Sequence, residues 1–148
     1  MNSARDVTYR LDLAKGFLEE AEQDLGLKRW RSAVNNAQLA VENAGKAVLA
    51  LFGAAPKTHE PSRDLSSLMR TRNLQEDVLE KMRRILPDLL ALGLPEHFLT
   101  DYGDEETYTL PWDLFDEASA LEAAEAARRA FQLAKEIAGL VRNGDREG

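Results

Sequence analysis

Residues 30–52 read WRSAVNNAQLAVENAGKAVLALF, and this stretch decides the fold class of the protein. Its apolar and small residues recur at spacings of three and four, which places them on one face of a helix. Four of them are alanines, whose short side chains let a neighbouring helix approach closely. Gly53 follows the run, as glycine often does at the end of a helix. The face consists of Trp30, Ala33, Val34, Ala37, Ala40, Val41, Ala44, Val48 and Leu51.

One helix is expected before this segment and one after it. The first spans residues 4–25, where Val7, Leu11, Ala14, Leu18, Ala21 and Leu25 form one apolar stripe, and Gly26 is its expected stop signal. The other is short and spans residues 62–69. Ser62 is its candidate N-cap, because serine hydroxyls accept hydrogen bonds from the first free N–H groups of a helix.

Two longer helices are expected in the second half of the chain. One begins near Asn73, and Pro87 either kinks it or divides it in two. The last helix, capped by Asp113 or Asp116, ends near Arg142. Its predicted apolar stripe consists of Leu121, Ala124, Phe131, Ala134, Ile137, Ala138 and Val141.

The chain shows no sustained alternation of apolar and polar residues, so no strand is expected beyond a small hairpin between His97 and Trp112. The connections between helices are mostly short, which favours antiparallel neighbours. We therefore predict an all-α fold, a four- or five-helix up-and-down antiparallel bundle. Residues 1–142 form its single domain, and residues 143–148 are expected to be a disordered tail.

Composition limits the function. The 148 residues include 19 basic and 26 acidic ones, so the net charge of −7 argues against broad binding to nucleic acid. The absence of cysteine excludes disulfides, thiol nucleophiles and cysteine zinc sites. No apolar run reaches the length of a membrane helix, and the start of the chain does not read as a signal peptide, so a cytoplasmic location and no membrane partner are expected.

Charge is also unevenly distributed along the chain. Residues 101–127 hold nine acids and neither lysine nor arginine. Basic residues gather at Lys28, Arg29 and Arg31, and six more lie between residues 63 and 84. These residues either form a local basic surface or occupy solvated helix faces.

The central helix and the segments after it resemble the HEPN family, the higher eukaryotes and prokaryotes nucleotide-binding domain. Members often carry a Gln on this helix, then Ala-Val-Glu, and Lys-Ala four residues after that Glu. A glycine, a proline and a histidine often follow. In this sequence the matching residues are Gln38, Ala40-Val41-Glu42, Lys46-Ala47, Gly53, Pro56 and His59, with Thr100-Asp101-Tyr102-Gly103 further on.

The resemblance implies a helical bundle that is usually a homodimer. Many members are ribonucleases of toxin–antitoxin systems, or act beside small nucleotidyltransferases. The ribonucleases carry an Arg followed after four to six residues by a His, since His moves protons near neutral pH and Arg holds phosphate. Neither His59 nor His97 has an Arg at that spacing, because the positions in question are Phe52, Gly53, Ala54, Leu90, Ala91 and Leu92. We therefore expect no catalytic residues.

Six residues are the candidates for ligand binding. Glu42 and Lys46, four residues apart, form either a helix ion pair or a polar patch in the groove that the family implies. His59 caps a helix, satisfies a loop carbonyl or contacts a ligand phosphate. A ribonuclease with a non-standard constellation of His59 and Arg63 is the enzymatic alternative. The other two candidates are Asp101 and Tyr102.

No cofactor or metal site is expected. The acidic residues Asp101, Asp104, Glu105 and Glu106 do not follow a calcium-loop spacing, and Gly45-Lys46 lacks the preceding glycine of a P-loop. Asn35 and Asn36 are expected at the surface, unless one of them faces a groove or a partner. The aromatic residues Trp30, Tyr102, Tyr108 and Trp112 either stack on a base or pack at a bundle end or interface.

These observations favour a non-catalytic binding protein that forms a homodimer and binds a nucleotide or a partner nucleotidyltransferase. A purely structural or regulatory protein fits the same residues. The alanine face of the central helix is the candidate dimer interface, with Trp30 and Phe52 at its ends. The alternative is that the first and last helices of the same chain cover this face.

Overall fold

The structure is a computed structural model that describes residues 3–53, 60–93 and 99–147. Its helices are α1 (Ser3–Gly26), α2 (Trp30–Ala50), α3 (Pro61–Thr71), α4 (Glu76–Ala91), α6 (Pro111–Leu114) and α7 (Glu117–Glu147). Within these residues there is no strand, only one isolated antiparallel bridge between Asp104 and Thr109. The predicted all-α bundle is confirmed, and the bridge matches the small hairpin allowed for this region.

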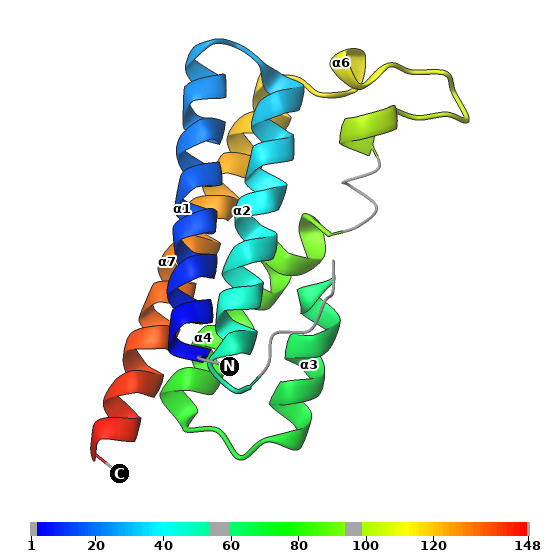
Figure 1. Cartoon of the computed structure of the whole chain (residues 1–148). Helices are drawn as coiled ribbons and strands as arrows, with labels where there is room; N and C mark the ends of the chain where they lie inside the picture. Colours follow the sequence, from blue (N-terminus) through cyan, green and yellow to red (C-terminus); the bar gives the residue numbers. More distant parts are fainter. Residues whose placement is uncertain (1–2, 54–59, 94–98, 148) are drawn as a thin grey trace.

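Helix α2 is the central element of the bundle (Figure 1), with α1 beside it and α7 behind. Every residue from Trp30 to Phe52 is buried or half-buried. The alanine face meets α1 and α7 of the same chain, and Ala33, Ala37, Ala40 and Ala44 have no exposed surface. Of the two interpretations of this face, the intrachain one is therefore correct. The alanine face cannot serve as a dimer interface.

Most of the expected helix ends lie within two residues of the observed ones. Gly26 remains inside α1, and the chain turns instead at Lys28, whose φ of 59° is left-handed. Ser62 is not the cap of α3, because Glu60 occupies the N-cap and Pro61 the first helical position, where the missing N–H of proline costs no hydrogen bond. Pro87 lies inside α4 without dividing it.

The last helix begins where the sequence predicts. The Ser119 N–H donates to Asp116 Oδ1 (2.9 Å), and the Asp116 N–H donates to Ser119 Oγ (2.9 Å), so the two residues cap α7 reciprocally. The Ser119 N–H and hydroxyl both donate to the Asp116 carboxylate, and these hydrogen bonds hold the pKa of Asp116 below its ordinary value of 3.8. The helix continues to Glu147, beyond the predicted end at Arg142. Leu121, predicted in the apolar stripe, is 45% exposed.

The region predicted as a long loop contains more structure than expected. Residues 99–102 are helical. Residues 103–110, named the arm here, form a tight hairpin that projects from the bundle beside the N-terminal end of α2 (Figure 1). Gly103 has a φ of +72°, and a Cβ there would lie 2.1 Å from the carbonyl oxygen of Thr109, so only glycine fits.

Candidate polar face of the central helix

Five polar side chains lie along one side of α2, at spacings of four, three, four and four residues. We name Arg31, Asn35, Gln38, Glu42 and Lys46 the polar face. Each is buried or half-buried. Buried polar groups require partners, because burial removes their hydrogen bonds to water. The partners of the polar face therefore define what this surface does.

Glu42 and Lys46 form the expected ion pair, with 3.5 Å between Glu42 Oε2 and Lys46 Nζ. The pair differs from a surface helix pair in its burial, since Lys46 as a whole is only 8% exposed. A buried ammonium without a carboxylate partner would be strongly destabilising. Glu42 therefore keeps the charge of Lys46 compatible with the folded chain. The ion-pair interpretation is confirmed.

Arg31, at the other end of the polar face, holds the segment that leads into the arm. Its Nε donates to the carbonyl oxygen of Thr100 (2.6 Å), and its Nη2 lies 3.5 Å from Asp101 Oδ1. The guanidinium also lies over the ring of Trp112, 5.9 Å from the ring centre, in a cation–π arrangement. One side chain thus contacts both ends of the segment that contains the arm.

Thr100 connects this segment to the middle of the polar face. Its hydroxyl lies 3.3 Å from Gln38 Oε1 and 3.4 Å from Asn35 Oδ1, and all of Thr100 is buried. A hydroxyl has one proton and can donate to only one of these oxygens. Gln38 Nε2 is buried with no partner in this arrangement. Rotating the Gln38 amide by 180° lets its NH₂ donate to Thr100, which then donates to Asn35.

Gly45 fixes where α3 begins, on the side of α2 next to the Glu42–Lys46 pair. A Cβ on Gly45 would lie 2.8 Å from Leu89 Cδ2 and 2.9 Å from Cβ and Cγ of Pro61. Glycine is therefore required for this close packing. The first residue of α3 and the core side of α4 both contact α2 at this point.

The structure does not join the five predicted residues that it describes into one site. Asp101 pairs with Arg31, and Glu42 pairs with Lys46. Arg63 is 84% exposed at its side chain and lies 3.5 Å from Glu60. Tyr102 is 64% exposed at the base of the arm. His59, and with it the proposed pairing of His59 and Arg63, lies outside the described residues.

Several polar partners escaped sequence reasoning. Asp24, 8% exposed, accepts hydrogen bonds from Ser32 Oγ (2.7 Å) and Asn36 Nδ2 (2.8 Å) and so holds α1 to α2. Asn36 is half-buried at this contact and Asn35 is half-buried beside Thr100, so the prediction that both are exposed is wrong. Their mid-helix position was the available signal, since asparagine is a poor helix former. The sequence pattern did not indicate which side chains these asparagines would contact.

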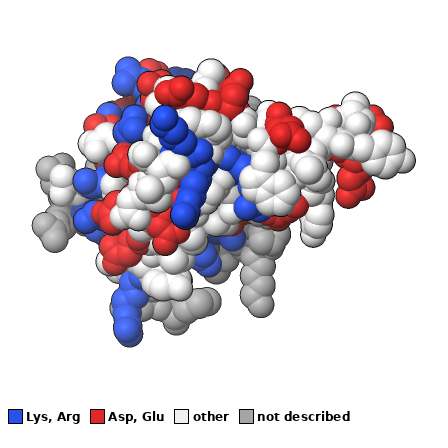
Figure 2. Space-filling model, turned by 90° about the horizontal axis from the view of Figure 1, so that it is seen from above, with Lys and Arg blue, Asp and Glu red and all other residues white. Residues whose placement is uncertain are grey.

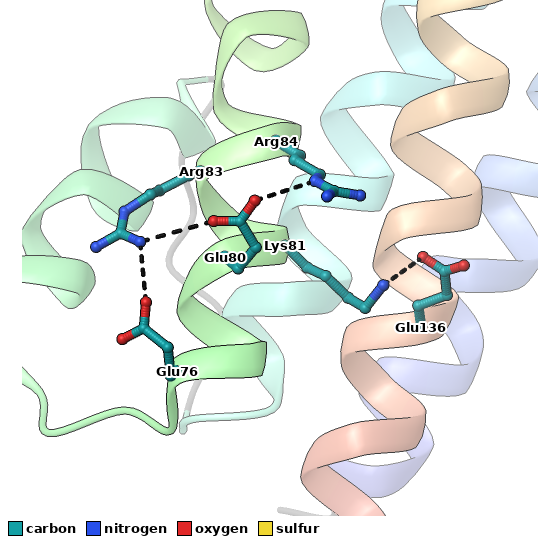
Figure 3. A network of polar contacts seen from close by, with 6 residues as sticks. All are labelled: Glu76, Glu80, Lys81, Arg83, Arg84 and Glu136. Carbon is teal, nitrogen blue, oxygen red and sulfur yellow. Dashed lines mark hydrogen bonds and ion pairs between the residues drawn. The ribbon is translucent and has the colours of Figure 1, made fainter.

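The basic residues of α4 do not form an open basic surface. On α4, Arg83 lies 3.3 Å from Glu76 Oε1, and Arg84 lies 3.3 Å from Glu80 Oε1 (Figure 3). Lys81 donates to Glu136 on α7 (3.1 Å) and thereby lowers the pKa of that carboxyl. The solvated interpretation therefore holds for this helix, because each of its cations is paired with an acid.

A second paired charge lies at the edge of a cavity of about 380 Å³ between α2, α4 and α7. Arg129 donates to both oxygens of the buried Asp88 (3.0 and 3.3 Å), and these hydrogen bonds raise the pKa of Arg129. Val34, Phe115 and other apolar residues line the rest of the cavity. Of the five predicted ligand residues that the structure describes, none lines it.

The described part of the chain contains no group of three or more metal-ligating His, Asp or Glu side chains. Among the described helices, none is both long and apolar enough to span a membrane.

The fold and the polar face define an all-α protein whose central helix carries an internally bonded row of polar residues. A family model of the HEPN domain matches residues 7–143, and the chain belongs to this family. It is 25% identical over 132 residues to "Putative toxin MJ1304" of Methanocaldococcus jannaschii, covering 84% of this chain and 86% of that protein.

A solved structure has the same fold. The crystal structure of TT1696 from Thermus thermophilus aligns with a TM-score of 0.63 over 93% of this chain and 99% of that chain. Because the two sequences are 24% identical, this likeness concerns the fold alone.

Proposed function

We propose that the protein is a non-catalytic HEPN-family member that forms a homodimer and binds a partner nucleotidyltransferase in a toxin–antitoxin-like pair. The observation that carries this proposal is the state of the polar face. Glu42, Lys46, Arg31 and Asp101 are already engaged in ion pairs within the chain. The Arg-to-His spacing of the family ribonucleases is absent from the sequence. Residues paired in this way stabilise the fold and do not form a group of catalytic side chains.

The toxin name of the archaeal relative supports the paired setting, because a toxin requires a partner that restrains it. The proposal is tested by purifying the tagged full chain under native conditions from its own cells and identifying bound proteins by mass spectrometry. A nucleotidyltransferase retained in a fixed ratio is the expected result. If no nucleotidyltransferase is retained at any ratio, the partner part of the proposal is wrong.

A free nucleotide is the alternative ligand. A ligand that binds the folded state raises the thermal midpoint in a concentration-dependent way. We therefore propose melting the protein with ATP, GTP and AMP, using Arg63→Ala and its matched control Arg70→Ala, which changes another exposed arginine of α3. A shift that Arg63→Ala abolishes and Arg70→Ala preserves would assign the nucleotide to Arg63. Identical curves with and without nucleotide would reject this ligand.

Ribonuclease activity with a non-standard site is the remaining alternative. Arg63 is largely exposed and pairs with Glu60, so no observed contact aims it at a substrate. Total RNA incubated with wild type and His59→Ala decides the question. Intact RNA, or cleavage that survives in His59→Ala, rules out the proposed His59–Arg63 constellation.

A further inference from the structure

The end of the bundle that carries the arm exposes two unlike surfaces. Figure 2 looks onto this end, with the arm projecting to one side and acidic side chains on it. The first surface is the arm with its base. The second is the turn between α1 and α2, formed by Leu27, Lys28 and Arg29. All three residues of the turn are exposed.

The arm combines aromatic and acidic side chains. Tyr108 is 92% exposed and Leu110 is 56% exposed, and at the base Tyr102 and Trp112 are 64% and 69% exposed. This is half of the large apolar residues that the described chain exposes strongly. Exposed apolar groups gathered in this way mark interaction surfaces. Acidic residues accompany them at Asp104, Glu105 and Glu106, and no basic residue lies within the arm.

The arm is held in one conformation without a partner. Asp104 and Thr109 exchange two backbone hydrogen bonds of 2.9 Å. Asp104 Oδ1 also accepts from the Glu106 N–H (3.0 Å), and Arg31 holds the base of the arm against α2. A surface that is ordered before binding loses little conformational entropy in a contact. Its tyrosine is therefore a good anchor.

The turn complements the arm in both charge and polarity. Leu27 is 61% exposed. Within the described residues, Lys28 and Arg29 form no ion pair, unlike the basic residues of α4 that Figure 3 displays. The turn thus offers two adjacent cations and an exposed leucine, which complement the acidic residues and the exposed tyrosine of the arm.

Backbone strain marks the same two surfaces. Among the described residues other than glycine, only Lys28 (φ 59°) and Tyr108 (φ 56°) adopt a left-handed conformation. Such a conformation is strained for a residue with a Cβ and is often retained at sites of function. Lys28 lies in the turn that follows α1, where the Arg29 N–H donates to the carbonyl oxygen of Asp24 (2.8 Å).

We propose that the arm of one copy of this chain docks on the Leu27–Arg29 turn of a second copy, and that the second copy does the same in return. This inference rests on the homodimer of the proposed function and assigns its interface. A two-fold contact places each surface in the dimer twice, so every substitution counts twice.

Charge exchange tests the contact directly. The arm-reversed variant carries Glu105→Lys and Glu106→Lys, and the turn-reversed variant carries Lys28→Glu and Arg29→Glu. Each variant alone juxtaposes like charges at both contacts. We expect each to raise the dimer dissociation constant about 100-fold in sedimentation equilibrium at low salt. Mixed in equal amounts, the two variants form a heterodimer in which both contacts pair opposite charges, and dimerisation returns.

Two further variants separate the contact from general effects. Glu19→Lys with Glu20→Lys makes the same charge change on the exposed side of α1, and it should leave the dimer intact. Tyr108→Asn removes the aromatic anchor but tolerates the left-handed backbone. It should weaken the dimer about tenfold or more. Circular dichroism of each variant establishes that the bundle is folded.

The outcomes are distinct. A wild-type monomer at tens of micromolar overturns both the homodimer and this interface. A wild-type dimer that survives both reversed variants overturns the interface and leaves the homodimer. If the reversed variants are folded monomers but do not form a heterodimer on mixing, the pairing of arm with turn is wrong. The pairing is also wrong if the wild type is a monomer whose arm binds a different protein in a fixed ratio.

Discussion

The substitution Gly45→Ala tests how closely α3 and α4 pack on the central helix. A new Cβ would have three neighbours closer than 3.0 Å: Leu89 Cδ2 at 2.8 Å, and Cβ and Cγ of Pro61 at 2.9 Å. The leucine methyl can turn away at small cost. The proline ring cannot, because Pro61 is fixed as the first residue of α3. Relief therefore requires a shift of α3 as a whole.

Two opposing effects set the magnitude. Overpacking a tight core costs roughly 1–3 kcal/mol, and three contacts shorter than 3.0 Å place this substitution in the upper part of the range, at about 2–3 kcal/mol. Alanine is better than glycine inside a helix by about 1 kcal/mol, which offsets part of this cost. We expect the free energy of unfolding to fall by about 1–2 kcal/mol, and the midpoint to fall by about 2–4 °C per kcal/mol in a domain of this size. Denaturant titration measures the first quantity and calorimetry the second.

The matched control is Gly16→Ala on α1. Gly16 is exposed, and a Cβ there meets nothing within 4 Å. The same chemical change should then stabilise the protein by about 0.5–1 kcal/mol, since only the helix propensity acts. The two variants should thus shift the midpoint in opposite directions. If Gly45→Ala melts at or above the temperature of the wild type, the close packing of Pro61 on α2 is refuted.

Three other perturbations have defined outcomes. Arg31→Ala removes the hydrogen bond, ion pair and stacking contact at the base of the arm, so limited proteolysis should cut the arm faster while the global midpoint changes little. Asp88→Ala removes the acceptor of two Arg129 hydrogen bonds and should cost about 0.5–1.5 kcal/mol in a denaturant titration, because the Arg129 side chain is 56% exposed and regains water. Asp116→Ala should lower the thermal midpoint at neutral pH. Because the folded pKa of Asp116 is lowered, its stabilisation is complete above the unfolded pKa and disappears as pH falls through the folded pKa. The gap between wild type and Asp116→Ala should therefore close in acid, and a gap that stays constant down to pH about 2 would contradict the capping role.

The helices could be predicted because their signals are local. The period of three and four residues along 30–52 identifies α2, and the cap at Asp116 is determined by residues within one turn. The left-handed turn at Lys28 was less predictable, because Gly26 is the residue that usually takes that conformation. The helical residues 99–102 carry no sustained apolar period, so nothing in the sequence set them apart from a loop.

The candidate site was predictable only where its contacts are short in sequence. Glu42 and Lys46 are four residues apart, and helical geometry alone brings them together. Arg31 and Thr100 are 69 residues apart, and their contact depends on how α2, residues 99–102 and the arm pack in three dimensions. The burial of Lys46 likewise depends on distant segments, so the sequence could predict the pair but not its burial.

The polar face and the arm differ in how easily a partner can bind to them. At the polar face, a ligand competes with contacts that the chain already makes, and it must reach Lys46, which is 8% exposed and paired with Glu42. At the arm, Tyr108 is 92% exposed and the backbone is already ordered, so a partner gains contacts without breaking any. The polar face stabilises the base on which the arm stands, through Arg31 and Thr100. We therefore expect Arg31→Ala to weaken dimerisation although Arg31 lies outside the proposed interface. If substitution of an exposed α3 residue such as Arg70 weakens dimerisation equally, the arm is not the contact.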